Sequence, residues 1–235
     1  MSNGTDCGEA PCFAHLLVGG HPVDPDTLRD VNRFRRAERQ RLYEVRKSFS
    51  PEQRGAATEA IIRDLKQVTG PLEGRRIAVY WPMLGEPDMR PWMKEAHSQG
   101  AQILLPEVVV KKQPLQFREW QPGARMARGI WNIPVPAEGA IGIPDLVISP
   151  LVGVDDECFR LGNGGGYYDM TLAGLSPRPH IIGIGLPGCA IPTIFPWRRR
   201  PARTDGAVAY RRPRHSEGEQ PQNRRNAAAN FAGFE

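Results

Sequence analysis

Ten consecutive residues, Arg160-Leu-Gly-Asn-Gly-Gly-Gly-Tyr-Tyr-Asp169, combine four glycines, two tyrosines and one carboxylate. Glycines adopt positive φ readily, so successive backbone N–H groups can converge on an anion without interference from side chains. A helix is expected from Tyr167 to Leu175, and its first N–H groups and its dipole favour the same anion. The run therefore predicts a phosphate-binding loop, with Asp169 one turn into the helix as a ligand for a divalent cation. A glycine-rich surface loop without a ligand is the alternative.

The elements that would position this loop alternate along the chain. Short β-rich runs bounded by glycine or proline are expected at 76–81, 103–105, 115–120, 146–149 and 181–186. Helices are expected at 25–47, from a capping box at Ser50 to about Val68, and at 90–98. This alternation favours an α/β fold: an open, mainly parallel sheet with helices on both faces, in a Rossmann-like three-layer architecture. The Pro-rich stretch at 134–144 is expected to be a loop.

Ligands of such sheets bind at the carboxyl ends of strands. Glu86 and the glycine loop at 162–166 each follow a predicted strand, so both are expected at that edge. The glycine loop also differs from two other phosphate-binding motifs. It has no Lys-Ser/Thr pair as in a Walker A loop, and no acidic residue about twenty positions later as a dinucleotide-binding fold requires.

Length and charge divide the chain into three parts. Its 235 residues suffice for one substantial core plus tails. Residues 1–24 are expected to be a disordered segment, 25–197 an α/β domain, and 198–235 an Arg-rich, disordered tail. The tail has nine arginines and four acidic residues, a net charge of +5, which equals the formal charge of the whole chain. A solvated extension is the favoured interpretation of the tail, and binding to nucleic acid is the weaker one.

Neither a membrane segment nor a metal-binding cysteine pattern is evident in the sequence. No stretch approaches the roughly 20 apolar residues that span a bilayer, and the first 24 residues lack the pattern of a secretory signal. Four cysteines, Cys7, Cys12, Cys158 and Cys189, have no paired zinc spacing. A cytoplasmic protein without membrane partners is therefore expected.

The ten-residue run resembles the signature of the 5-formyltetrahydrofolate cyclo-ligase family, also called methenyltetrahydrofolate synthetase, which reads Arg-Leu-Gly-x-Gly-x-Gly-Tyr-Tyr-Asp. Three further segments resemble the same family. Trp81-Pro-Met-Leu-Gly-Glu86 is similar to the segment that ends in a folate-contacting glutamate, and Gly100–Pro106 is similar to the strand that follows. Trp131-Asn-Ile-Pro134 is similar to a segment near the pterin. The resemblance covers roughly residues 31 to 196.

This resemblance implies an ATP- and Mg²⁺-dependent conversion of 5-formyltetrahydrofolate to 5,10-methenyltetrahydrofolate, with release of ADP and phosphate, by a protein that is expected to be monomeric. It implies catalytic roles for Arg160 and Asp169, with Asp169 as the Mg²⁺ ligand. Folate is expected to contact Trp81, Glu86 and Trp131. The implied ATP-binding residues are Arg35, Arg36, Arg39, Arg160, Leu161, Gly162, Asn163, Gly164, Gly165, Gly166, Tyr167 and Tyr168.

The assignment of arginines in the first helix depends on register. The family has a Lys-x-x-x-Arg pattern there, and an ungapped alignment back from Ser50 places Arg35 and Arg39 at those positions, with Arg36 a close rival to Arg35. Arginine keeps the charge of lysine but not its geometry. A solvated charged helix face is the alternative interpretation.

The C-terminal region departs from the family pattern, which requires an Asp that helps to hold the metal, a second Asp and a final strand. Arg200 occupies the approximate position of the first Asp, and a cation cannot ligate Mg²⁺. Asp205 is one possible substitute for the ligand, and residues 206–210 are a possible strand. A reading-frame shift near Pro196 is a hypothesis that accounts for the change. A family relative that binds ATP or folate without turnover therefore stays open as an alternative function.

Overall fold

The computed structural model describes residues 17–18, 21–22, 25–192 and 206–209. At its centre lies a six-stranded sheet in the order β12-β11-β8-β3-β4-β5. Its strands are β3 (Arg76–Val79), β4 (Gln102–Glu107), β5 (Gln116–Trp120), β8 (Leu146–Pro150), β11 (His180–Gly185) and β12 (Gly206–Ala209). All neighbouring pairs are parallel except β4 and β5. The sheet is therefore mainly parallel, and the predicted fold class is confirmed.

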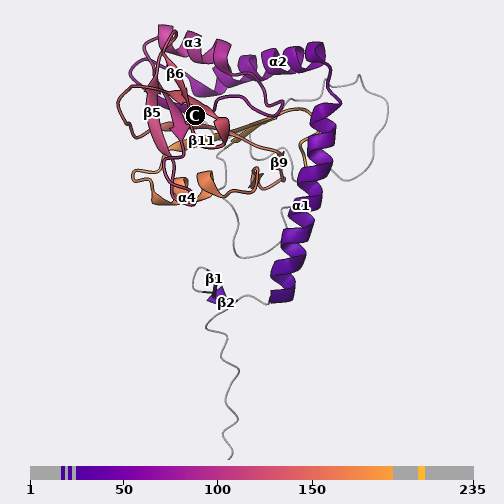
Figure 1. The fold of residues 1–235 in the computed structure, drawn as a ribbon. Coiled ribbons are helices and arrows are strands. Elements are labelled where there is room, and N and C mark those ends of the chain that lie inside the picture. Colours follow the sequence, from indigo (N-terminus) through magenta and orange to yellow (C-terminus); the bar gives the residue numbers. More distant parts are fainter. Residues whose placement is uncertain (1–16, 19–20, 23–24, 193–205, 210–235) are drawn as a thin grey trace, which may run out of the picture.

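Helices cover both faces of this sheet. Figure 1 shows α2 (Pro51–Thr69) and α3 (Arg90–Ser98) on one face and α4 (Tyr167–Gly174) on the other, which gives three layers. The long helix α1 (Pro25–Lys47) runs along one side and extends beyond the layers (Figure 1). The start of α2 is fixed by a capping box in which Ser50 and Gln53 satisfy each other's backbone N–H groups.

The alternation of side chains along β3 explains why the sheet needs both helical layers. Ile77 and Val79 belong to one buried cluster with Ile61 of α2 and Trp92 of α3. Ala78 points to the other face and packs in a separate cluster that includes Leu172 of α4. Successive residues of a strand point to opposite faces, so a strand with three buried apolar residues must be covered on both.

Helix α1 is held against the domain near its C-terminal half. Leu42 is buried with Val152, Leu161 and Ile191, beside the hairpin of β9 (Gly153–Val154) and β10 (Arg160–Leu161). A Cβ atom added to Gly153 would lie 2.7 Å from Leu42 Cδ1, so glycine permits this close approach. The contact brings the α1 side chains on either side of Leu42 toward the loop that follows β10.

Several predicted boundaries change. The strand expected over 76–81 ends at Val79, and the stretch expected as a loop at 134–144 contains β7 (Pro134–Pro136), which pairs with β6 (Met126–Arg128). Residues 206–209 form β12 beside β11, so the strand considered possible at 206–210 is present within the range otherwise expected as a tail. In the N-terminal segment, β1 (Leu17–Val18) pairs with β2 (His21–Pro22). Arg200 and Asp205, and with them the predicted loss of a metal ligand and the frame-shift hypothesis, lie outside the described residues.

Candidate functional site

A cavity of about 700 Å³ opens where several strands end. Its walls come mainly from α1, the segment after β3, the segment that includes Trp131, and residues 160–169 around the glycine loop, with further residues from the ends of β4 and β8 and from the residue before β5. The lining residues are Asn32, Arg35, Arg39, Tyr80, Trp81, Met83, Leu84, Glu86, Pro106, Val108, Leu115, Trp131, Ile133, Pro150 and residues 160–169. All but one of the predicted site residues line this cavity.

The glycine loop has a backbone that requires glycine at two positions. Gly164 has φ +101° and Gly166 has φ +69°, conformations that strain residues with a side chain. Gly166 is also the N-terminal cap of α4, so the first N–H groups of the helix adjoin the loop. Glycines and a helix start together present backbone donors, which is the arrangement that anion binding requires; anion binding by the loop stays a prediction.

Arg160 is the buried cation of the loop. Its side chain is 4% exposed, and its Nη2 atom donates to Asp169 Oδ1 at 2.7 Å. The guanidinium lies 5.1 Å from the centre of the Tyr168 ring. Its Nε atom is buried and has no hydrogen-bond partner among the described residues. A buried guanidinium donor without a partner is well suited to an anionic ligand, because an unsatisfied buried donor is unfavourable.

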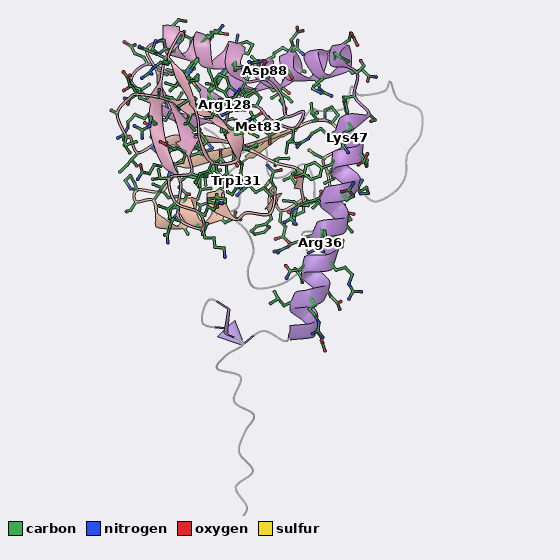
Figure 2. The ribbon with its side chains drawn as sticks, in the orientation of Figure 1. Arg36, Lys47, Met83, Asp88, Arg128 and Trp131 are labelled. Atoms are coloured by element: carbon green, nitrogen blue, oxygen red, sulfur yellow. The ribbon has the colours of Figure 1, made fainter. Side chains whose placement is uncertain are left out.

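The three arginines of α1 predicted to bind ATP differ in whether they line the cavity. Arg35 and Arg39 line it, whereas Arg36 is exposed and does not (Figure 2). Arg39 Nε donates to the carbonyl oxygen of Gly162 at 2.8 Å. The pKa of Arg35 is lowered, first by burial and then by the charge of Arg39. Two neighbouring cations disfavour each other's charge, so an anion between them and the glycine loop would be stabilised.

Glu86 is the buried carboxylate of the cavity. It is 8% exposed, and its Oε2 atom accepts from the backbone N–H of Met83 at 3.0 Å. The Asn163 side chain also favours the ionised form of Glu86, and Arg46 Nη1 lies 4.0 Å from Oε1. Burial nevertheless raises the pKa of Glu86 above its usual value. Burial disfavours the ionised form of this carboxylate, and N–H donors of a ligand bound in the cavity would stabilise it.

Two tryptophans line the same cavity in different settings. Trp81 is partly buried, and the Arg90 guanidinium lies 5.6 Å from its ring. Trp131 is 54% exposed, has φ +57°, and meets the Tyr167 ring edge-on at 5.3 Å between centroids. Figure 2 shows Trp131 and Met83 on the body of the domain. Trp131 thus joins one wall of the cavity to the start of α4.

Sequence reasoning missed Arg46 and Tyr43, which reach the site from α1. Arg46 is 5% exposed and approaches Glu86, and Tyr43 Oη donates to Asn163 Oδ1 at 2.8 Å. A helical spacing could have revealed Arg46. Arg35, Arg39 and Arg46 follow an i, i+4, i+11 pattern, which places them on one face of a helix.

The described residues include no group of three or more His, Cys, Asp or Glu side chains arranged to hold a metal ion. Asp169, in the first turn of α4, is the carboxylate that lines the cavity beside the glycine loop. Mg²⁺ in nucleotide-using enzymes is commonly held by one or two carboxylates together with substrate phosphates. A single loop carboxylate therefore fits a Mg²⁺ ion that arrives with a nucleotide, and does not fit a cage made by protein alone. In the part of the chain that the structure describes, no helix is long and apolar enough to cross a membrane.

The fold and the cavity define an α/β protein with an arginine-lined glycine loop and a buried carboxylate in one pocket. The sequence model of the 5-formyltetrahydrofolate cyclo-ligase family matches residues 31–186. The chain belongs to this family of ligases, whose known activity is ATP-dependent.

Individual relatives agree. The chain is 31% identical over 122 residues to the 5-formyltetrahydrofolate cyclo-ligase of Mycolicibacterium smegmatis. The aligned region covers 48% of this chain and 62% of that protein, which is less than two thirds of its length. It is 25% identical over 140 residues to the enzyme of the same name from Haemophilus influenzae, with 57% and 75% covered.

Solved structures show the same fold. The 5,10-methenyltetrahydrofolate synthetase of Aquifex aeolicus superposes with a TM-score of 0.65 at 24% identity, over 82% of this chain and 99% of that one. The synthetase of Mycoplasma pneumoniae superposes with a TM-score of 0.61 at 20% identity, over 74% and 97%.

Proposed function

We propose that this protein converts 5-formyltetrahydrofolate to 5,10-methenyltetrahydrofolate with ATP and Mg²⁺, releasing ADP and phosphate. The observation that carries the proposal is the single cavity that contains both the glycine loop with its arginines and the buried Glu86. Membership of the family supplies the reaction. We further expect a monomeric, cytoplasmic enzyme, which gel filtration and cell fractionation will test.

The chemistry requires a poor leaving group to become a good one. The formyl oxygen attacks the γ-phosphorus of ATP, the bond from that phosphorus to the ADP oxygen breaks, and ADP leaves. N10 then attacks the activated carbon and loses its proton, and the C–O bond breaks with release of phosphate. Phosphoryl transfer of this kind depends mainly on in-line positioning and on neutralisation of the developing charge.

The residues of the cavity have roles that follow from their chemistry. The N–H groups of residues 162–166, with Arg35, Arg39 and Arg160, would bind the phosphates. Asp169 would hold Mg²⁺, which neutralises phosphate charge when bound. On the other substrate, Glu86 would accept from N–H groups of the folate, and Trp81 and Trp131 would flank the pterin. Arg36 is exposed outside the cavity and is not retained as an ATP ligand.

A binding protein of the same family without turnover is the second candidate, because the sequence places Arg200 where the family has a metal-ligand Asp. The two candidates share the cavity and differ in the reaction. Binding of ATP and of 5-formyltetrahydrofolate without product therefore identifies the second.

The test is the rise in absorbance of methenyltetrahydrofolate when purified protein, ATP, Mg²⁺ and 5-formyltetrahydrofolate are combined. We expect turnover that requires both ATP and Mg²⁺ and that is lost in Asp169→Ala. Asp64→Ala is the matched control, since Asp64 lies on α2 and does not line the cavity. Absence of product from a folded protein that binds both substrates would overturn the proposal in favour of the second candidate.

A further inference from the structure

Glu86 is surrounded by a set of side chains that comes from two other parts of the chain. Arg46 reaches it from α1, with 4.0 Å between Nη1 and Oε1. The Asn163 side chain, from the glycine loop, lines the same cavity and favours the ionised form of Glu86. Tyr43, also on α1, donates to the Asn163 amide oxygen at 2.8 Å. The carboxylate is thus connected both to a helix and to the loop expected to bind phosphate.

The Arg46 side chain contacts backbone carbonyl groups as well as the Glu86 carboxylate. Its Nη2 atom donates to the carbonyl oxygen of Leu151 at 3.0 Å, and its Nη1 atom lies 3.5 Å from the carbonyl oxygen of Leu84. The turn at Gly85 has φ +75° and lies against the Arg46 side chain, where a Cβ atom would come within 3.4 Å. Arg46 therefore holds the turn from Leu84 to Glu86 as well as the carboxylate itself.

Asn163 serves a different purpose from the rest of its loop. Its amide oxygen accepts from Tyr43, so its amide nitrogen is the group that can donate to Glu86. Its backbone meanwhile belongs to the glycine loop. A change in loop conformation on binding phosphate would move the Asn163 amide and so change the polar surroundings of Glu86.

We propose that Arg46 and Asn163 are positioning residues that hold Glu86 ready for the folate, and that Asn163 couples occupation of the glycine loop to folate binding. The inference rests on the proposed function for the identity of the two ligands. Coupling between two sites is reciprocal, so ATP strengthens folate binding by the same factor as folate strengthens ATP binding. The element that both ligands bias is the loop that carries Asn163.

The protonation of Glu86 gives a second readout, because an ionised carboxylate accepts from folate N–H groups and a protonated one accepts less well. The groups that face Glu86 are Arg46 and Tyr43 of α1, Tyr80 after β3 and Tyr168 of α4. Arg46 is the cation among them that favours the ionised form. Removing its charge must therefore shift the loss of folate binding to a higher pH.

The coupling is tested by calorimetric titration of 5-formyltetrahydrofolate with and without a non-hydrolysable ATP analogue and Mg²⁺. We expect the analogue to strengthen folate binding by about fivefold or more in the parent protein, within the usual range of coupling. In Asn163→Ala the factor falls to about one. Gln40→Ala is the matched control, because Gln40 is an exposed amide of α1 that donates to Glu44, outside the cavity. An undiminished factor in Asn163→Ala, or none in the parent protein, overturns the coupling.

The positioning role of Arg46 is tested by the pH dependence of folate binding without nucleotide. In Arg46→Gln we expect folate affinity at neutral pH to fall roughly tenfold or more, and the acidic midpoint of binding to move to higher pH. Arg46→Lys should have the midpoint of the parent protein, because lysine keeps the charge. It should not have the full affinity, because lysine lacks the several fixed N–H donors of the guanidinium. An unchanged midpoint in Arg46→Gln overturns the role, as does a midpoint in Arg46→Lys that equals that of Arg46→Gln.

A control variant, a fallback variant and the choice of readout keep these tests interpretable. Arg75→Gln removes a partly exposed ion pair, with Asp145 at 3.4 Å, away from the cavity, and should leave the folate midpoint unchanged. If Arg46→Gln does not fold, Arg46→Lys decides the positioning role, because a folate affinity equal to that of the parent protein would overturn it, and Asn163→Ala decides the coupling. All readouts are binding measurements, so they do not depend on turnover. A protein that binds both ligands without turnover would refute the proposed reaction but would not decide this inference.

Discussion

Two charged parts of the cavity, Glu86 (here called the folate end) and the glycine loop (the phosphate end), differ in burial. The Glu86 carboxylate is buried and already has protein partners in Met83, Arg46 and Asn163. The glycine loop is more open, with residues 163–165 exposed, and it faces the cations Arg35 and Arg39. The protein itself therefore positions the Glu86 carboxylate. At the glycine loop, by contrast, the positive charges of Arg35 and Arg39 lie together, and an anionic ligand would balance them.

This contrast indicates where each end obtains its binding energy. A buried, hydrogen-bonded carboxylate gives specificity, because a ligand that lacks matching donors leaves it unpaired. An arginine-rich loop gives attraction to any phosphate group, with selectivity left to its geometry. Mutations at the two ends should therefore differ in which ligand they affect and in how strongly pH affects them.

Arg160→Lys should have the largest effect, at the phosphate end. A lysine keeps the charge but cannot contact Asp169 and a phosphate with one rigid fork. We expect turnover to fall by roughly 10²- to 10³-fold. Affinity for the ATP analogue should fall as well and account for most of this loss. Steady-state kinetics and calorimetry measure both. Arg125→Lys, at an exposed ion pair with Glu138, is the control, and a loss confined to folate binding would contradict the assignment.

Glu86→Gln should give the next largest effect, at the folate end. The amide keeps the size of the side chain but replaces one acceptor oxygen with a donor, which opposes the N–H groups of the ligand. We expect folate affinity to fall by roughly tenfold to a hundredfold and affinity for the ATP analogue alone to change little. Equilibrium titration of each ligand separately checks this. Equal losses for the two ligands would show that the ends are not distinct.

The fold was largely accessible from sequence because its signals are local. The capping box at Ser50 and the apolar runs of β3 and β11 report their own structure within a few residues. β7 was missed because prolines were interpreted as breaks, although a short edge strand tolerates them. The strand β12 was anticipated as a possible strand at 206–210, although its four small and apolar residues lie in an Arg-rich context.

The site was accessible only in part, for a different reason. The glycine loop and Glu86 carry sequence motifs, whereas Arg46 is one of several arginines on a single helix. Whether an arginine on α1 faces the cavity depends on the rotation of the helix, which the packing of Leu42 fixes. The partnership of Asn163 with Glu86 joins residues 77 positions apart, and no local pattern predicts such a contact.

Trp131→Ala should have a smaller effect that involves both ends, because Trp131 meets Tyr167 at the start of α4. An aromatic pair contributes about 0.5–1.5 kcal/mol beyond its buried area. We expect KM for the folate to rise by roughly threefold to tenfold and kcat to change little. Thermal unfolding should hardly change, since the side chain is 54% exposed. A large fall in melting temperature would show that Trp131 is structural.

The smallest effect is expected in the pH dependence of stability. Burial raises the pKa of Glu86, so the folded protein binds its proton more tightly than the unfolded chain does. Its contribution to the free energy of unfolding is therefore greatest below the usual pKa of a glutamate and decreases as pH rises through the raised value.

Glu86→Gln removes this titration. We expect the free energy of unfolding of the parent protein, minus that of Glu86→Gln, to fall as pH increases from about 4.5 and then to level off. Each unit by which the pKa is raised contributes about 1.4 kcal/mol to the fall. Urea denaturation of both proteins across this range measures it. A difference that grows with pH would mean that Arg46, Asn163 and the Met83 N–H stabilise the ionised carboxylate by more than burial disfavours it.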